Sequence, residues 1–212
     1  MNNLEEQIYK LGVIPVVALD DAGLAVDLAK ALISGGLPCA EITFRTAAAK
    51  DSIRLITNEF PDMLVGAGTV LTVEQAKDAL EAGAKFIVAP GFDAELVDYC
   101  LENNVPVFPG CVTPSELTQA YKRGLGIVKF FPASNFGGLS MIKALAGPFP
   151  KMKFIPTGGI NKDNLTEYIE SDKIFACGGT WMVKKDLINN KEFDKIEQMT
   201  KEAVEIVKQY RR

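Results

Sequence analysis

Short apolar runs alternate with longer amphipathic segments along almost the whole chain. The first apolar run covers residues 13–19, and each later run is followed in the same way by a helix-like segment. The runs are continuous in apolar character, which is typical of strands in a parallel sheet that is buried on both faces. Further strands are therefore predicted near residues 39–44, 63–68, 86–89, 105–109, 126–130, 153–156 and 174–177.

The segments between these runs have the spacing of amphipathic helices. Apolar residues four and then three positions apart predict a short N-terminal helix over residues 2–11, ending at Gly12. Asp20 and Asp21 can cap the helix that follows the first strand. Further helices are predicted near residues 47–59, 73–82, 93–103, 114–122, 138–146, 162–169 and 192–210.

Strict alternation of strands and helices allows an open doubly wound sheet or a closed barrel. Eight β–α units follow one another, and that number favours closure. An open dinucleotide-binding sheet would also need a GxGxxG motif after the first strand, and residues 15–21 carry none. We therefore predict a single (β/α)8 TIM barrel domain over residues 1–212, with an extra N-terminal helix. The length is low for this fold, so the site must be built from strand ends.

The predicted strand near residues 126–130 contains one lysine among apolar residues, in the segment Ile127-Val128-Lys129-Phe130-Phe131-Pro132-Ala133. Side chains alternate along a strand, so Lys129 and Phe131 share one face. Burial disfavours a charged ammonium group, and a free amine attacks a carbonyl to make a Schiff base. Lys129 is therefore a candidate nucleophile. The alternative is a lysine that pairs with a carboxylate or extends to water.

The second predicted strand ends with polar side chains, in Glu41-Ile42-Thr43-Phe44-Arg45-Thr46. A period of two places Glu41, Thr43 and Arg45 on one face. A carboxylate, a hydroxyl and a guanidinium pointing together are costly unless they face one another or a ligand. The alternative to a ligand site is an internal ion pair between Glu41 and Arg45.

Glycines mark the ends of several other predicted strands, where barrel active sites lie. The third strand runs into Gly66-Ala67-Gly68-Thr69 and the fourth ends at Ala89-Pro90-Gly91, where small residues let a ligand approach the backbone. The seventh strand leads into Thr157-Gly158-Gly159 and the eighth into Gly178-Gly179-Thr180. Paired glycines after these two strands predict a phosphate site, because backbone N–H groups can converge there on an anion. Plain tight turns are the alternative.

Composition narrows the classes of function. The formal net charge is −4 without a basic cluster, which argues against nucleic-acid binding. The N-terminus lacks the cationic and apolar regions of a secretory signal, and no apolar run is long enough to cross a bilayer. We therefore expect a cytoplasmic protein that binds neither nucleic acid nor a membrane. The four cysteines have no CxxC spacing and are predicted to be buried free thiols.

The chain contains no histidine, so the commonest general base and the commonest metal ligand are both missing. A metal site would need oxygen or thiolate ligands only. The sequence therefore favours chemistry that runs on a carboxylate and a lysine.

Together these motifs resemble the 2-keto-3-deoxy-6-phosphogluconate / 4-hydroxy-2-oxoglutarate aldolase family. The matching blocks run in the order of the family from about residue 10 to the C-terminus, at residues 41–46, 65–70, 129–133, 146–149, 156–160 and 178–181. The resemblance implies a class I aldolase without metal or cofactor. Such an enzyme cleaves the keto acid 2-dehydro-3-deoxy-6-phosphogluconate to pyruvate and glyceraldehyde 3-phosphate. Family members usually form homotrimers.

The resemblance also implies roles for individual residues. Lys129 matches the Schiff-base lysine and Glu41 the general acid/base. Arg45 and Thr69 match the groups that hold the substrate carboxylate, and Pro90 and Phe131 match residues that line the pocket. The phosphate site matches Thr157, Gly158, Gly159, Gly179 and Thr180. Serine is usual at position 180, so the extra methyl group of threonine can crowd the phosphate. Thr157 is typical of members that use the gluconate substrate.

Other functions are compatible with the same residues. A metal-dependent barrel aldolase or a phosphosugar isomerase could use this fold, as could a non-catalytic barrel that binds a phosphorylated metabolite. Within the aldolase interpretation, cleavage of 4-hydroxy-2-oxoglutarate to pyruvate and glyoxylate is open, and so is the galactonate epimer.

Overall fold

The computed structural model describes residues 3–211, in which parallel strands alternate with helices. The strands are β1 (Val13–Val17), β2 (Cys39–Thr43), β3 (Leu64–Gly68), β4 (Ile87–Val88), β5 (Val107–Phe108), β6 (Ile127–Phe130), β7 (Lys153–Pro156) and β8 (Cys177–Gly179). The α-helices are α1 (Asn3–Leu11), α2 (Ala25–Ser34), α3 (Ala49–Glu59), α4 (Val73–Glu81), α5 (Ala94–Glu102), α6 (Pro114–Lys122), α7 (Gly138–Ala146), α8 (Leu165–Ile169), α9 (Lys185–Asn189) and α10 (Phe193–Tyr210). Short 3₁₀ helices are η1 (Ala22–Leu24), η2 (Ser134–Phe136) and η3 (Trp181–Val183).

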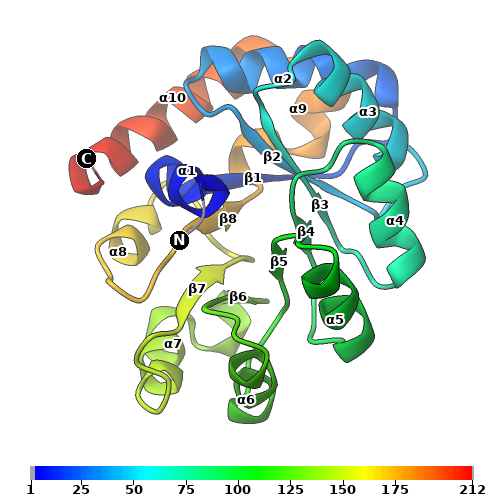
Figure 1. Ribbon diagram of the computed structural model, residues 1–212. Helices are drawn as coiled ribbons and strands as arrows, with labels where there is room; N and C mark the ends of the chain where they lie inside the picture. Colours follow the sequence, from blue (N-terminus) through cyan, green and yellow to red (C-terminus); the bar gives the residue numbers. More distant parts are fainter. Residues whose placement is uncertain (1–2, 212) are drawn as a thin grey trace.

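The strands pair in parallel and the sheet they form is curled (Figure 1). Six of them hydrogen-bond in the order β5-β4-β3-β2-β1-β8, and β6 pairs with β7. Isolated parallel bridges connect the two sheets, from Gly110 to Lys129 on one side, and from Phe154 to Ile174 and Thr157 to Gly178 on the other. Helices cover the outer side of the strands (Figure 1). The chain is therefore an α/β fold built on a curled parallel sheet, as the alternating pattern predicted.

The strands separate two apolar clusters, one on each face of the sheet. Along β6, Ile127 belongs to the smaller cluster, whereas Val128 and Phe130 belong to the larger one under the helices. The predicted alternation of faces along this strand is thereby confirmed. The smaller cluster contains Ile8, Ile14, Cys39, Leu64, Phe86, Val88, Phe108, Ile127, Ile155, Phe175 and Ala176.

Helix α1 closes this smaller cluster at the end where the strands begin. Ile8 is fully buried in it. Arg211 fastens the helix, since its guanidinium donates to the Tyr9 carbonyl at 2.7 Å and to the Ile174 carbonyl at 2.9 Å. The predicted N-terminal helix is confirmed, although residue 2 lies outside the described residues.

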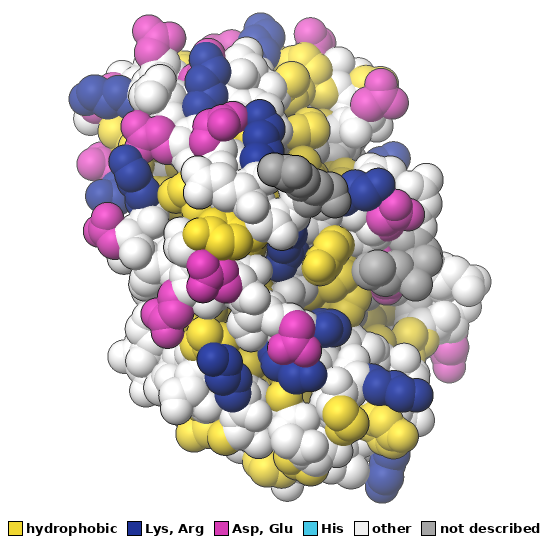
Figure 2. Space-filling view, turned by 90° about the vertical axis from the view of Figure 1, so that its left-hand side faces the viewer, with side chains coloured by type: hydrophobic (Ala, Val, Ile, Leu, Met, Phe, Trp, Pro, Cys, Tyr) yellow, Lys and Arg dark blue, Asp and Glu magenta, His cyan; other side chains and the backbone are white. Residues whose placement is uncertain are grey.

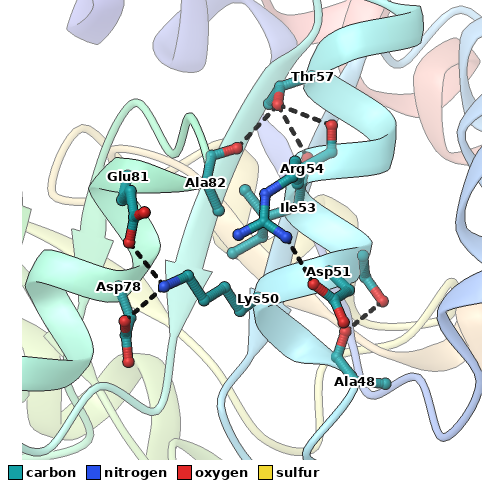
Figure 3. A network of polar contacts seen from close by, with 10 residues as sticks. Ala48, Lys50, Asp51, Ile53, Arg54, Thr57, Asp78, Glu81 and Ala82 are labelled. Carbon is teal, nitrogen blue, oxygen red and sulfur yellow. Dashed lines mark hydrogen bonds and ion pairs between the residues drawn. The ribbon is translucent and has the colours of Figure 1, made fainter.

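Polar contacts link the two helices that follow β2 and β3 (Figure 3). Lys50 of α3 reaches Asp78 of α4 at 2.6 Å and Glu81 at 2.7 Å. The Thr57 hydroxyl donates to the Ala82 carbonyl at 2.9 Å, at the other end of the same contact. These contacts join the helices behind the strands that carry Glu41 and Gly68.

The strands predicted near residues 86–89 and 105–109 are shorter in the structure, as β4 and β5, and two other predicted elements differ more. The eighth strand was predicted over residues 174–177, which is wrong, because β8 is Cys177–Gly179 and Ile174 makes only an isolated bridge. Glycine is a poor strand former, but β1 supplies partners for both glycines, Ile14 opposite Gly178 and Pro15 opposite Gly179. The helix predicted over 162–169 is shorter, because a polar turn precedes α8, in which Asn164 accepts from the Asn161 N–H.

The four cysteines are all free and buried, as predicted. Burial raises the pKa of Cys111 to about 12, with Glu116 adding to the effect, so this thiol is unreactive at neutral pH. On the face drawn in Figure 2, acidic and basic side chains are interspersed without a patch of one sign. Among the described residues, none of the helices has both the length and the apolar character needed to span a membrane.

Candidate active site

The structure brings Lys129 and Glu41 together inside the curled sheet. Lys129 lies on β6 and Glu41 on β2, 88 residues apart in the sequence, and the lysine Nζ is 3.4 Å from the Glu41 Oε1. Both are buried, with 4% and 2% of their surface exposed. Within residues 3–211 the salt bridge of Glu41 is thus with Lys129, and the alternative of a Glu41–Arg45 pair is wrong. A primary amine and a carboxylate therefore face each other out of solvent.

Gly68 makes the room for the Glu41 carboxylate. A Cβ atom at Gly68 would lie 2.0 Å from the Glu41 Oε1 and 2.6 Å from its Cδ. Gly66 makes room in the same way for the ring of Phe86, 2.2 Å from the position of its missing Cβ. Both glycines lie within β3, so the interpretation as a tight turn is wrong. A larger residue would not fit at either position, because side chains of neighbouring strands occupy the space beside them.

Replacing Gly68 with alanine is expected to displace the Glu41 carboxylate and lower kcat about a hundredfold, because misplacing a reacting group by about 1 Å can cost that much. Steady-state cleavage rates measure the effect, and circular dichroism checks the fold. Gly126→Ala is the matched control, since a Cβ there meets no atom within 4 Å. Unchanged kcat in a folded Gly68→Ala protein would contradict the role given to Glu41.

Thr43 positions Arg45 at the end of β2. Its hydroxyl donates to the Val17 carbonyl at 2.8 Å and accepts from the Arg45 Nε at 3.2 Å. The sequence placed Thr43 on this face, but it was not among the predicted site residues. Arg45 itself is exposed and faces a cavity at the rim. Its guanidinium is therefore oriented by the protein and open to an anionic ligand.

Thr69 follows β3 with a φ of 53°, in the left-handed region. This conformation is unfavourable for a β-branched residue, and such strain is concentrated at functional sites.

At the ends of β4 and β5 the backbone is closely packed, because a Cβ at Gly110 would lie 2.0 Å from the Pro90 carbonyl oxygen. The ring of Phe131 lies 5.3 Å from the Lys129 Nζ and is 39% exposed. The position of Phe131 fits the predicted pocket lining.

The glycine pair after β7 forms a turn that only glycine adopts easily. Gly158 has a φ of 97° and Gly159 a φ of 82°. Ser134 holds this turn, since its N–H donates to the Gly158 carbonyl at 3.1 Å, and its hydroxyl lies 1.9 Å from where a Cβ of Gly159 would be. Sequence reasoning missed Ser134, because nothing in its own neighbourhood marks it.

Thr157 is 95% buried, and its hydroxyl oxygen has no hydrogen-bond partner among the described residues. It lies against β8, where a Cβ at Gly178 would come within 2.3 Å of that oxygen. A buried hydroxyl without a partner is costly, so this one is available to a hydrogen-bond partner that the chain does not supply. The bridge between Thr157 and Gly178 also keeps the two predicted phosphate loops side by side.

Thr180 is exposed and lines a cavity of about 340 Å³ at the ends of β1, β2 and β8. Arg45 lines the same cavity, although the resemblance assigns the two residues to opposite ends of the substrate. Gly179 has a packing role, since a Cβ there would lie 1.9 Å from the Trp181 ring. Within residues 3–211, no three acidic or cysteine side chains gather as a metal site would need.

A lysine buried beside a carboxylate, inside a curled parallel sheet with glycine loops at its rim, is the kind of site that a lysine-dependent aldolase needs. The family model described as KDPG and KHG aldolase matches residues 4–199. The chain therefore belongs to the KDPG and KHG aldolase family.

Similar proteins cover nearly the whole chain. The 2-dehydro-3-deoxy-phosphogluconate aldolase of Treponema pallidum is 45% identical over 98% of this chain and 99% of its own length. The KHG/KDPG aldolase of Escherichia coli is 41% identical over 94% of each. A crystal structure of the KDPG aldolase from Legionella pneumophila, with pyruvate captured as a covalent carbinolamine intermediate, matches with a TM-score of 0.89 at 38% identity. That match covers 93% of this chain and 96% of the other.

Proposed function

We propose that the protein is a class I aldolase that cleaves 2-dehydro-3-deoxy-6-phosphogluconate to pyruvate and glyceraldehyde 3-phosphate. The observation that carries this proposal is the buried Lys129 amine, 3.4 Å from the Glu41 carboxylate. The relatives from T. pallidum and E. coli support the substrate, and the carbinolamine in the L. pneumophila structure supports covalent chemistry on an amine.

In the first stage, the neutral amine of Lys129 attacks the C2 ketone to give a carbinolamine. Loss of water then gives a protonated imine, which is an electron sink. Glu41 is within reach of the lysine nitrogen, so it can accept the proton that the amine loses and return it to the departing hydroxyl group, which leaves as water. Burial of both groups excludes bulk water from the intermediate.

In the second stage, Glu41 removes the proton of the C4 hydroxyl. The C3–C4 bond breaks, its electrons flow into the imine, and an enamine and glyceraldehyde 3-phosphate result. Glu41 then returns a proton to C3, and hydrolysis of the imine releases pyruvate and the free lysine. One carboxylate suffices, because each step returns the proton that an earlier step took.

The other predicted residues hold the two anionic ends of the substrate in this proposal. Arg45 and Thr69 bind the carboxylate, for which a guanidinium offers two parallel donors. Thr157, Gly158, Gly159, Gly179 and Thr180 bind the phosphate, with Pro90 and Phe131 lining the pocket between. The contact of Thr43 with Arg45 and the unpaired Thr157 hydroxyl support these assignments.

We also propose that the eight strands close into one (β/α)8 barrel and that residues 1–212 are a single domain. The parallel bridges on both sides of the β6–β7 pair support closure. A homotrimer in the cytoplasm follows from the resemblance to the family, and analytical ultracentrifugation would test the trimer.

Pyruvate release from three keto acids tests the function. We expect the largest kcat/KM for 2-dehydro-3-deoxy-6-phosphogluconate, less for the galactonate epimer, and measurable cleavage of 4-hydroxy-2-oxoglutarate, which the name of the E. coli relative favours. EDTA should leave the rate unchanged, because the proposed mechanism uses no metal. Binding without pyruvate release from any of the three would contradict the proposal and favour a non-catalytic barrel.

A further inference from the structure

Three cationic side chains line the cavity beside Thr180, together with the apolar residues Val16, Ala18 and Val183. Arg45, Lys184 and Lys185 line it, against a single carboxylate from Asp186. The two lysines follow η3 directly, so they lie on the segment that continues from Thr180. None of the motifs singled out in the sequence includes them. A cavity of about 340 Å³ with this lining is suited to an anionic group.

Lys185 is held in this structure by a residue from a different loop. Its Nζ lies 2.7 Å from the Oδ1 of Asp20, in the segment between β1 and η1. The side chains are 52% and 48% exposed. Exposed pairs of this kind are weak and exchange partners readily, because water screens the attraction. The neighbouring Asp21 is already used, since it caps η1 by accepting from the Gly23 N–H at 2.8 Å.

We propose that Lys185 is a specificity-determining residue that leaves Asp20 to bind the terminal phosphate of the substrate. A phosphate near Thr180 carries more charge than the Asp20 carboxylate and offers three oxygens, so it competes well for the ammonium. Asp20 therefore competes with the ligand for the Lys185 ammonium, and only a ligand with a doubly charged group displaces the carboxylate. The protein is therefore expected to bind a phosphorylated ligand more tightly than the same ligand without the phosphate.

This inference rests on the proposed aldolase function, and its test separates the two. Lys185→Met and Asp20→Asn are compared in two assays on the full chain. The first is KM for 2-dehydro-3-deoxy-6-phosphogluconate. The second is the pyruvate concentration that half-saturates borohydride trapping on Lys129, which involves no phosphate. Lys10→Met is the control, because Lys10 is an exposed lysine paired with Glu6 at the far end, on α1.

Lys185→Met is expected to raise KM about tenfold, the loss of one charged hydrogen bond, with trapping by pyruvate changed less than twofold. Asp20→Asn is expected to lower KM by up to about fivefold, because the competing carboxylate is gone. A Lys185→Met protein with wild-type KM overturns the inference. So does a rise in KM in both variants, since the pair would then be a structural link between loops. Wild-type protein that traps no pyruvate overturns the aldolase function itself.

Discussion

Borohydride added together with pyruvate is expected to leave one reduced pyruvate adduct on the chain, on Lys129. The imine forms only on an amine that loses its proton and meets the ketone, and Lys129 is buried beside a carboxylate that can take that proton. Peptide mass mapping locates the adduct. Lys129→Met is expected to abolish it and to lower kcat at least about 10⁴-fold, as removal of a covalent nucleophile does in other enzymes.

A lysine on the neighbouring strand serves as the control for this experiment. Lys153 begins β7, pairs in register with Ile127 and contacts the backbone carbonyl of Asp172, so Lys153→Met should keep both the adduct and the rate. Breaking a buried ion pair commonly costs about 3–5 kcal/mol, so Lys129→Met can also destabilise the fold. The double variant Lys129→Met with Glu41→Gln removes both charges and should recover part of that stability. An adduct on another lysine in the wild type would contradict the mechanism.

The pairing of Lys129 with Glu41 shows how far sequence reasoning reaches. Each residue stood out locally, as a charge within an apolar strand, and parallel strands place such residues inside one curled sheet. The pattern could not show which cation meets the Glu41 carboxylate, because the alternation of side chains places Arg45 on the same face as Glu41. The alignment of β6 with β2 across the interior decides it, and that is a property of the whole sheet.

The residues that support the site through packing could not be predicted from the sequence. Gly68 resembles a turn glycine in the sequence, and only the neighbouring strand reveals that Glu41 fills the space beside it. The same holds for Gly159, where the Ser134 hydroxyl fills the space beside the missing Cβ. A local pattern records what a residue is, but the space left by a missing Cβ depends on side chains from distant segments. Lys185, the first residue of α9, escapes for the same reason, since its partner Asp20 lies in a distant loop.

Glu41→Gln is expected to separate imine formation from cleavage of the C3–C4 bond. The amide has nearly the size of the carboxylate and can still accept a hydrogen bond from Lys129, but it cannot take up a proton. Loss of a general acid/base costs about 10²–10⁴ in rate, so kcat should fall by that factor while borohydride still traps pyruvate on Lys129. Single-turnover cleavage and trapping, measured on the same preparation, give the two values.

Glu116→Gln provides the matched control, because it makes the same substitution at a glutamate that was not among the predicted site residues. Glu116 forms the capping box of α6 with Thr113, so its substitution should affect stability and leave kcat unchanged. If Glu41→Gln slowed trapping as much as cleavage, Glu41 would act only by receiving the lysine proton, and another group would have to move the C4 hydroxyl proton. If trapping persists while cleavage is lost, the proton that breaks the carbon–carbon bond passes through Glu41, because no histidine exists in the chain to replace it.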